Sequence, residues 1–399
     1  MTALSDHVDG QVLVVNAGSS SVKLAVLDPA SGRRALTGLA ERVGSPEASV
    51  RLDRGGERST SAPDDGSHAG VIASLLGLMT GAERASIAAV GHRVVHGGPV
   101  YSSSVLIDHA VRVRLEALTS LAPLHLPGNL AGIDATLSAL PAVPQVAVFD
   151  TAFHSTMPPR AAQYAVPRSW RDDLGVRRYG FHGTSHRHVS GLARERWFAE
   201  ADDVRIVVLH LGNGASATAV RDGVSVDTTM GFTPLEGLVM GTRSGDVDPG
   251  VIPYVAERLD IDAAEVVRLL NTESGLLGVS GSSNDMRTLL EAADGGNDDA
   301  ALAVELFCYR AAKHVAGLSV ALGRLDAVVF TGGIGENSAP VRAAVVEHLG
   351  VLGLILDAAA NREHGQAGGG RIDRGAGPLV LVVPTDEELL IARDTVALA

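Results

Sequence analysis

The chain has 399 residues, of which 46% are hydrophobic and 20% are charged, and its formal net charge is −13. This length exceeds what one hydrophobic core usually holds, so we expect two domains, and the acidic balance argues against a general nucleic-acid or membrane-surface binder. The single cysteine, Cys308, argues against a disulfide framework and favours the cytoplasm. The polar, acidic N-terminus argues against a secretion signal, and the lack of a long apolar stretch argues against a membrane span.

Apolar residues recur along the chain with both the period of strands and the period of helices, which predicts a mixed α/β fold. The predicted strands are residues 11–15, 22–28, 35–43, 88–95, 145–149, 205–211, 215–220, 224–228, 326–330 and 379–383. The predicted helices are residues 69–80, 109–120, 128–139, 184–198, 250–258, 262–271, 284–293, 299–322, 338–349 and 386–397. Two polar, glycine-rich segments, 53–68 and 361–377, are predicted to be surface loops.

The chain also contains an internal repeat. Residues 12–26 (VLVVNAGSSSVKLAV) align without gaps on residues 206–220 (IVVLHLGNGASATAV), and later a short strand enters a polar turn in both 146–154 (VAVFDTAFH) and 327–337 (AVVFTGGIGEN). We therefore expect two duplicated halves, each led by a hairpin, with a ligand site in the cleft between them, because domain interfaces favour ligands. Accidental likeness of apolar strands with glycine turns is the alternative.

The first hairpin, VVNAGSSSVK (14–23), looks like a phosphate-binding loop. It lacks the G-x-x-x-x-G-K-[ST] pattern, and the chain has neither a G-x-G-x-x-G nor a G-x-S-x-G motif. Backbone amides in such a turn could still converge on a phosphate, with Asn16 toward a hydrated Mg²⁺ and Lys23 toward a phosphate. A plain hairpin turn explains the same residues, so both interpretations stay open.

Charged side chains follow several predicted strands. Arg93 lies near a strand end in GHRVVHGG (91–98), Asp150 lies at another in FDTAFHSTMP (149–158), and the carboxyl ends of strands are where open α/β sheets bind ligands. Arg243 stands in the long glycine-rich loop 230–250.

Three histidines, His182, His186 and His188, occur together in YGFHGTSHRHVS. The H-x-x-x-H spacing could place two imidazoles on one helical face, but the glutamate of a zinc-protease motif is missing. Packing or surface roles for His186 and His188 are therefore favoured over a zinc site.

Together these stretches resemble the acetate kinase family, also called acetokinases. The likeness runs in order from NAGSSSVK to VVPTDEELLIARDT, through HRVVHGG, PLHLPGN, FDTAFH, YGFHGTSH, HLGNGAS, MGFTPLEGLVMGTRSGDVDP, NTESGLLGVSGSSNDMR and TGGIGEN. It implies the duplicated actin-like (ribonuclease H-like) fold of the sugar kinase/Hsp70/actin superfamily. The N-terminal domain would comprise residues 1–154, completed by the C-terminal helix 388–399, and the nucleotide-binding domain would comprise residues 155–387.

The resemblance also implies an activity: reversible, Mg²⁺-dependent (or Mn²⁺-dependent) in-line transfer of the γ-phosphoryl group of ATP to acetate, giving acetyl phosphate and ADP. The family's members are cytoplasmic homodimers, so the resemblance implies a homodimer here. Neither nucleic acid nor a membrane is expected as a partner, because the net charge is −13. A propionate or butyrate kinase of the same superfamily and a non-catalytic, actin-like ATP-binding protein are the alternatives. Val95 favours the two-carbon acid, because a smaller residue there would admit another methylene.

Residue roles follow from the motifs that match. The catalytic positions are Asp150, His182 and Arg243. The carboxylate-binding arginine and the apolar wall around the acyl group are Arg93, Val95, Leu124, Phe181 and Pro234. The nucleotide-binding positions are Lys23, His210, Leu211, Gly212, Asn213, Gly214, Asp285, Met286, Arg287, Gly333, Ile334, Gly335, Glu336 and Asn337. The metal positions are Asn16 and Glu387. Asp386 stands where the family has asparagine, so Glu388 remains an alternative to Glu387.

The expected chemistry explains these residue types. A carboxylic acid with a pKa near ~4 is already ionised at neutral pH, so the substrate needs no general base. The difficulty is to bring one anion against another, which calls for positioning and charge neutralisation by arginine forks, a histidine and Mg²⁺. Asp150 is therefore expected to orient an arginine or a Mg²⁺ ligand rather than to act as a base.

Overall fold

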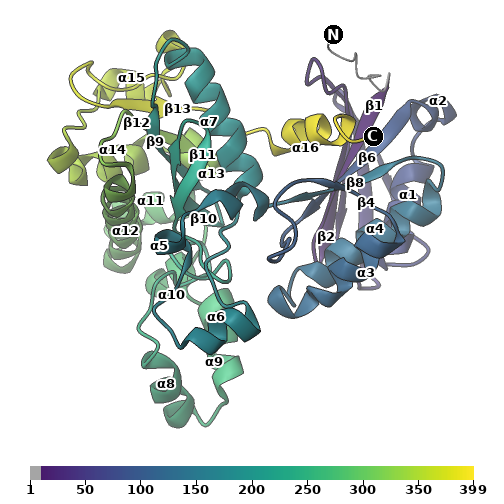
Figure 1. The fold of residues 1–399 in the computed structure, drawn as a ribbon, viewed down its shortest axis with the longest axis horizontal. Helices are drawn as coiled ribbons and strands as arrows, with labels where there is room; N and C mark the ends of the chain where they lie inside the picture. The colour runs from purple at the N-terminus through teal and green to yellow at the C-terminus, as the bar shows by residue number, and fades with distance from the viewer. Residues whose placement is uncertain (1–9) are drawn as a thin grey trace. The chain divides into compact units, whose positions relative to one another are not determined.

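The computed structural model describes residues 10–399, which contacts divide into two units (Figure 1). Unit 1 comprises Met1–Phe153 and Asp386–Ala399, and unit 2 comprises His154–Thr385. The start of the chain, on which the expectation of no secretion signal rests, lies outside the described residues. That the two units are independently folding domains with boundaries at 154/155 and 387/388 stays a prediction.

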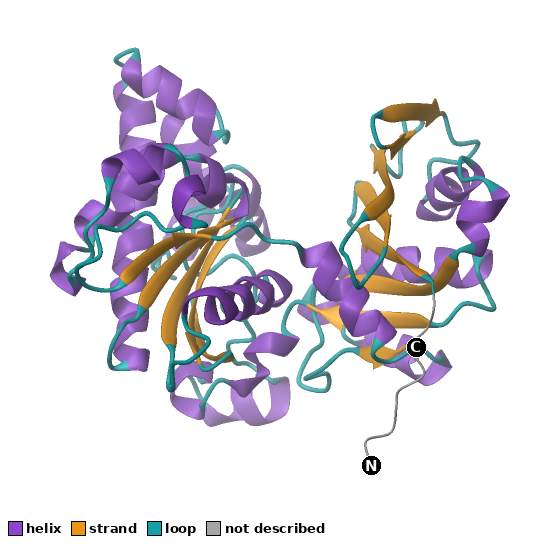
Figure 2. Cartoon of the chain, turned by 90° about the horizontal axis from the view of Figure 1, so that it is seen from above, coloured by secondary structure: helices purple, strands orange, loops and turns teal. Residues whose placement is uncertain are grey.

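Each unit contains one β-sheet with helices alongside it (Figure 2). The strand order in unit 1 is β5-β4-β3-β2-β1-β6-β8-β7. Its strands are β1 (Gln11–Ala17), β2 (Ser21–Leu27), β3 (Arg34–Glu41), β4 (Ser49–Arg54), β5 (Glu57–Ser61), β6 (Ile87–Val94), β7 (Val105–Leu106) and β8 (Gln145–Phe149). Its helices are α1 (His68–Gly77), α2 (Gly81–Ala85), α3 (His109–Ala117), α4 (Leu126–Ala139) and α16 (Glu387–Val396).

Different helices cover the two faces of the unit 1 sheet. Because side chains alternate along each strand, successive residues contact different helices. Leu13 and Val15 of β1 belong to a core shared with α1 and α4, whereas Val12 and Val14 pack with Ile391 of α16. The last helix of the chain therefore completes the core of the first unit.

The sheet of unit 2 has the strand order β11-β10-β9-β12-β13. Its strands are β9 (Arg205–Leu211), β10 (Ala215–Arg221), β11 (Val224–Thr228), β12 (Ala327–Thr331) and β13 (Leu379–Val382). Its helices are α5 (Pro159–Ala162), α6 (Arg168–Leu174), α7 (Gly183–Trp197), α8 (Val251–Leu259), α9 (Ala263–Thr272), α10 (Gly275–Ser280), α11 (Met286–Asp294), α12 (Asp298–Leu322), α13 (Gly332–Asn337), α14 (Ala339–His348) and α15 (Ala358–Arg362).

Five strands of the unit 1 sheet, in the order β3-β2-β1-β6-β8, have the same topology as the five-stranded sheet of unit 2, which agrees with the predicted α/β fold of two duplicated actin-like units. In each sheet the first strand (β1 or β9) runs antiparallel to the second (β2 or β10) and parallel to a later one (β6 or β12). A further parallel strand, β8 or β13, follows. All four hairpin strands contain seven residues, so the gap-free alignment of the two hairpins matches equivalent strands.

The second predicted correspondence, between 146–154 and 327–337, is wrong. The strand β12 pairs directly with β9, whereas β8 is separated from β1 by β6. The topological partner of β12 is therefore β6, and that of β8 is β13. The error has a physical origin, because short strands that are buried on both faces are uniformly apolar and resemble one another in sequence.

All predicted strands and helices are present within three residues at their ends. The segment 53–68 is not one loop, as predicted, because β4 continues to Arg54 and β5 follows at Glu57–Ser61. Strand β5 has the polar sequence ERSTS, which shows no apolar alternation. It lies at the sheet edge, where backbone pairing with β4 holds it. No helix within residues 10–399 combines the length and apolarity needed to cross a membrane.

Candidate active site

In unit 1, strand alternation brings four predicted site residues to one face of the sheet. Asn16 follows Val12 and Val14 at two-residue steps, so it shares their face, and it pairs in register with Lys23 of β2. Gly91 of β6 lies against α16, so Arg93, two residues later, faces the same side. Asp150 follows the β8 residues Val146 and Val148 in the same way.

Arg93 and Asp150 form a bidentate ion pair. Arg93 Nε donates to Asp150 Oδ1 at 3.0 Å and Nη2 donates to Oδ2 at 2.7 Å, while only 1% of Asp150 is exposed. Burial raises the pKa of the Asp150 carboxyl, and the Arg93 guanidinium opposes that effect. Burial alone would lower the pKa of Arg93, but the carboxylates of Asp150 and Glu387 raise it, so the arginine stays charged. Glu387 Oε2 lies 3.9 Å from Arg93 Nε.

The three consecutive acids at the start of α16 have different partners. Asp386 caps the helix by accepting from the Leu389 amide at 3.0 Å, a role that aspartate and asparagine fill equally well. Arg34 donates to Asp386 at 2.7 Å and to Glu388 at 2.9 Å. Of the three, Glu387 is the acid beside Arg93. The asparagine-to-aspartate difference from the family pattern is thus accommodated by helix capping.

The two predicted acyl-wall residues of unit 1 lie in loops. Val95 follows β6, and its amide donates to Asn129 Oδ1 at 3.0 Å. Leu124, just before α4, is 62% exposed. Its predicted role in the acyl wall stays a prediction.

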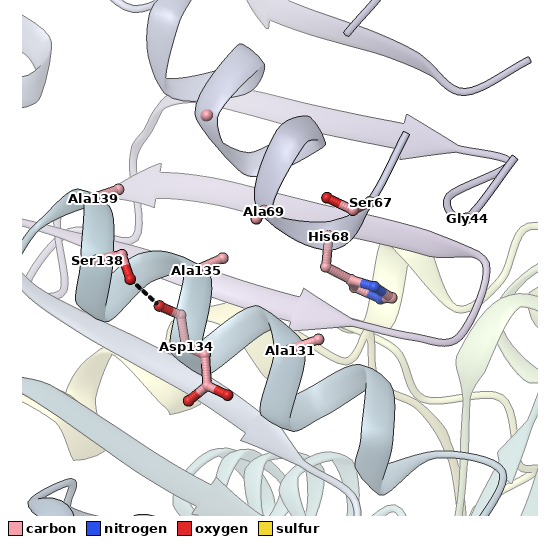
Figure 3. Close-up of a pocket in the computed structure, with 10 residues that line it drawn as sticks. Gly44, Ser67, His68, Ala69, Ala131, Asp134, Ala135, Ser138 and Ala139 are labelled. Atoms are coloured by element: carbon pink, nitrogen blue, oxygen red, sulfur yellow. Dashed lines mark hydrogen bonds between the residues drawn. The ribbon is translucent and has the colours of Figure 1, made fainter. Parts of the chain in front are cut away.

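A pocket of about 740 Å³ lies elsewhere in unit 1, between α1 and α4 (Figure 3). Small side chains such as Ala69 and Ala135 line it, and Ser138 Oγ donates to the Asp134 carbonyl at 2.9 Å on its wall. His68 Nε2 lies 2.7 Å from the carbonyl oxygen of Gly18, in the β1–β2 turn. None of the ten residues that line this pocket is a predicted site residue.

In unit 2, the β9–β10 turn brings His182 and Arg243 together. A Cβ placed on Gly214 would lie 3.3 Å from Nε2 of His182 and 3.8 Å from Nη1 of Arg243. His182 precedes α7 with a left-handed backbone (φ 56°), which is a strained conformation for a residue other than glycine. Its ring stacks on His210 with a centroid distance of 4.4 Å.

Arg243 is a half-buried guanidinium without an acidic partner among the described residues. Its Nη1 donates to the Pro234 carbonyl at 3.4 Å and lies 3.8 Å from Met240 Sδ, and no carboxylate within residues 10–399 pairs with it. Burial consequently lowers its pKa from the ordinary arginine value. The Gly241 amide donates to the Asn213 carbonyl at 2.9 Å, which ties the loop of Arg243 to the hairpin turn.

The three predicted nucleotide segments are neighbours at the carboxyl edge of this sheet. Helix α13, which contains Gly333–Asn337, begins at Gly332, whose Cβ would lie 2.7 Å from the Leu211 carbonyl oxygen. Asn284 donates to Asn213 Oδ1 at 3.3 Å, which joins the segment 285–287 to the same turn. Asp285 itself caps α11 by accepting from the Arg287 and Thr288 amides. Phe181 is buried beside His182 in the chain.

Sequence reasoning missed several residues that hold these groups, namely Arg34, Asn129, Ser185, Ser216, Asn284 and Thr385. Ser185 Oγ lies 2.7 Å from His210 Nδ1 and 2.9 Å from Thr385 Oγ1. A polar residue inside a fully buried strand, as at Ser216 in β10, is the one signal that could have found such a group. No cluster of three or more histidine, cysteine, aspartate or glutamate side chains within residues 10–399 could hold a metal ion by itself.

The chain is similar to known proteins over nearly its whole length. The model of the acetokinase family matches residues 11–393. The chain is 52% identical to the acetate kinase of Deinococcus radiodurans over 384 residues, which cover 96% of each chain. The structure is similar to that of a propionate kinase from Francisella tularensis (42% identity, TM-score 0.93, 98% and 100% of the two chains). It is also similar to that of Porphyromonas gingivalis acetate kinase (42% identity, TM-score 0.91, 97% and 99%). With a family match over nearly its whole length and relatives at about half identity, the chain belongs to the acetokinase family.

Proposed function

We propose that this kinase transfers the γ-phosphoryl group of ATP to acetate, reversibly, giving acetyl phosphate and ADP. The observation that carries the proposal is Arg243, a half-buried guanidinium that pairs with no carboxylate within residues 10–399 and lies beside His182 and the Gly214 turn. An uncompensated buried charge costs folding free energy unless an anionic ligand completes it. A phosphoryl group in transfer is such an anion.

The proposed reaction is a direct displacement. A carboxylate oxygen of acetate forms the new bond to the γ-phosphorus while the bond from that phosphorus to the β–γ bridging oxygen breaks, and the electron pair leaves on ADP. Arg93 binds the acetate carboxylate, and Arg243 and His182 bind the transferred phosphoryl group. The apolar residues Val95, Leu124, Phe181 and Pro234 surround the methyl group. The segments at 210–214, 285–287 and 333–337, with Lys23, bind the nucleotide.

Asp150 is proposed to position Arg93. Its two oxygens accept both donors of one guanidinium edge, and it is almost fully buried. A carboxylate fixed in this way holds the fork of Arg93 in one plane and needs no role as a base, because acetate is already an anion.

Mg²⁺ fits the residues of unit 1 by donor chemistry. The amide of Asn16 and the carboxylate of Glu387 supply oxygen, the atom that Mg²⁺ prefers. Few protein ligands are typical of Mg²⁺, which keeps waters and binds substrate phosphates, and this agrees with the absence of a three-acid cluster among residues 10–399. When bound, the ion would neutralise charge on the β- and γ-phosphates. The pairing of Glu388 with Arg34 favours Glu387 as the metal-facing acid.

A propionate kinase is the second candidate, because a solved structure with that name is similar over the whole chain. The test is the purified chain with MgATP and acetate, propionate or butyrate, with ADP and hydroxylamine-trapped acyl phosphate measured together. We expect equal yields of both products and the highest kcat/KM with acetate, with propionate lower by about 10- to 200-fold. A higher kcat/KM for propionate would establish the second candidate, and ADP without acyl phosphate would refute both.

We also propose a cytoplasmic homodimer that binds neither nucleic acid nor membranes. The net charge of −13 supports the second part, because phosphate backbones and anionic lipids would be repelled. Sedimentation of the purified chain would test the dimer.

A further inference from the structure

A serine hydroxyl in unit 2 lies between two imidazole rings. Ser216 of β10 is fully buried, and its Oγ lies 2.9 Å from Nδ1 of His182 and 2.7 Å from Nε2 of His186. His186 stands one helical turn after His182 on α7 and is also fully buried. The hydroxyl therefore connects a predicted catalytic histidine to a histidine without a predicted role.

The positions of the protons follow from counting donors. A serine has one hydrogen, so Ser216 donates to one ring and accepts from the other. Nδ1 of His186 is buried and has no hydrogen-bond partner among the described residues. Burial lowers the pKa of His186 well below its usual value, so this ring is neutral and carries one proton. A buried N–H group without an acceptor is costly and rare, so the proton lies on Nε2 and is donated to Ser216.

The Ser216 hydroxyl is then left to donate to Nδ1 of His182. His182 accepts there, and its own proton lies on Nε2. Nε2 is 3.3 Å from the position that a Cβ on Gly214 would occupy, and Nη1 of Arg243 is 3.8 Å from the same point. The N–H of His182 is thus presented at the hairpin turn, next to the guanidinium.

We propose that Ser216 and His186 are positioning residues that hold His182 as its Nε2–H tautomer. The uncharged imidazole of His182 then donates a hydrogen bond from Nε2 to the transferred phosphoryl group. Protonating His182 at Nδ1 would turn the Ser216 hydroxyl toward His186 and force the His186 proton onto the buried Nδ1. The cation of Arg243 opposes the same protonation. The assignment of a phosphoryl ligand rests on the proposed function, whereas the tautomer does not.

The test combines nitrogen NMR with kinetics. In the ¹⁵N-labelled wild-type chain, the His182 signals, identified by their loss in His182→Gln, should show a proton on Nε2 and none on Nδ1. The spectrum is recorded at about pH 7.5, roughly one unit above the ordinary histidine pKa. A proton on Nδ1, or on both nitrogens, would overturn the proposal without any variant.

Ser216→Ala should mix the two tautomers and lower kcat roughly tenfold, the effect of about one hydrogen bond, with both KM values within about twofold. His186→Gln keeps an N–H donor and should retain the wild-type spectrum and most of kcat. The matched control is Ser225→Ala, because Ser225 is equally buried and lies 2.9 Å from Nδ1 of His154 rather than His182. An unchanged spectrum and kcat in Ser216→Ala, or an equal loss of kcat in Ser225→Ala, would refute the assignment. A wild-type chain that forms no acyl phosphate would instead refute the proposed function and leave the tautomer to the NMR result.

Discussion

Replacing Gly91 with alanine should disturb the candidate site of unit 1 through a helix that the new side chain pushes. The added Cβ would lie 2.3 Å from Thr395 Oγ1 and 2.8 Å from Ile391 Cγ2, both on α16. Non-bonded heavy atoms approach to about 3.5 Å, so the helix must retreat by about 1 Å at this point. The added Cβ meets two different side chains, so rotation of only one of them cannot relieve both contacts. Because both side chains belong to α16, the helix itself must move.

The displacement reaches the chemistry because α16 begins with Glu387. That carboxylate lies 3.9 Å from Arg93, which is two residues from Gly91 on the same strand. A misplacement of about 1 Å can cost about 10²-fold in turnover. The overpacking itself should lower the free energy of unfolding by about 1–3 kcal/mol.

The assay is kcat and both KM values for Gly91→Ala at saturating and limiting Mg²⁺, with the urea midpoint of unfolding. Gly77→Ala is the matched control, because no atom lies within 4 Å of the Cβ it would add in α1. The double variant Gly91→Ala/Thr395→Ala should recover part of both losses, because Thr395 Oγ1 is the nearest obstacle and bonds only within its helix. Wild-type turnover and stability in Gly91→Ala would refute the reasoning.

Three further outcomes are expected. Arg243→Lys keeps the charge but loses the planar fork, so kcat should fall about 10³-fold with little change in the acetate KM; a loss below about tenfold would contradict the assigned role. Asp150→Asn should raise the acetate KM and lower the unfolding free energy by about 3 kcal/mol, because Arg93 loses its charged partner. A new limb in the pH profile of kcat would instead indicate that Asp150 acts as a base. Burial lowers the pKa of His92 and of His154 to about 4, below their value in the unfolded chain, so the unfolded state binds more protons between these values. The urea midpoint should therefore fall as the pH is lowered from about 7 toward 5, and a midpoint independent of pH over this range would contradict the burial of neutral histidines.

The hairpins could be predicted from the sequence because their information is local. Seven-residue strands that are mostly apolar and buried, joined by small turns, leave a pattern that needs no knowledge of the rest of the chain. Which later strand pairs with each hairpin is decided by packing between distant segments, and the wrong match of 146–154 with 327–337 reflects this. Strand β5 illustrates the opposite limit, since its polar residues carry no pattern at all.

The site divides in the same way. Motif resemblance supplied the residues predicted to face the ligands, but not the residues that contact them. Arg34 meets Glu388 across 354 positions of the chain, and the side chain of Asn129, on α4, accepts from the amide of Val95, which follows β6. Such contacts depend on tertiary structure, so a sequence without its fold cannot rank them.

Arg93 of unit 1 and Arg243 of unit 2 differ in charge compensation, and this difference suits the different anions that we propose they bind. Arg93 is held by Asp150 and approached by Glu387, so little positive charge remains for a ligand, which matches an acetate ion with a single charge. Arg243 pairs with no carboxylate within residues 10–399, so its charge is available to the phosphoryl group that we propose it binds. An enzyme that held both anions with uncompensated arginines would pay two desolvation costs before binding either substrate. In the proposed reaction, compensating only the arginine assigned to acetate keeps that cost to one arginine, and it leaves the unpaired charge on the arginine assigned to the transferred phosphoryl group.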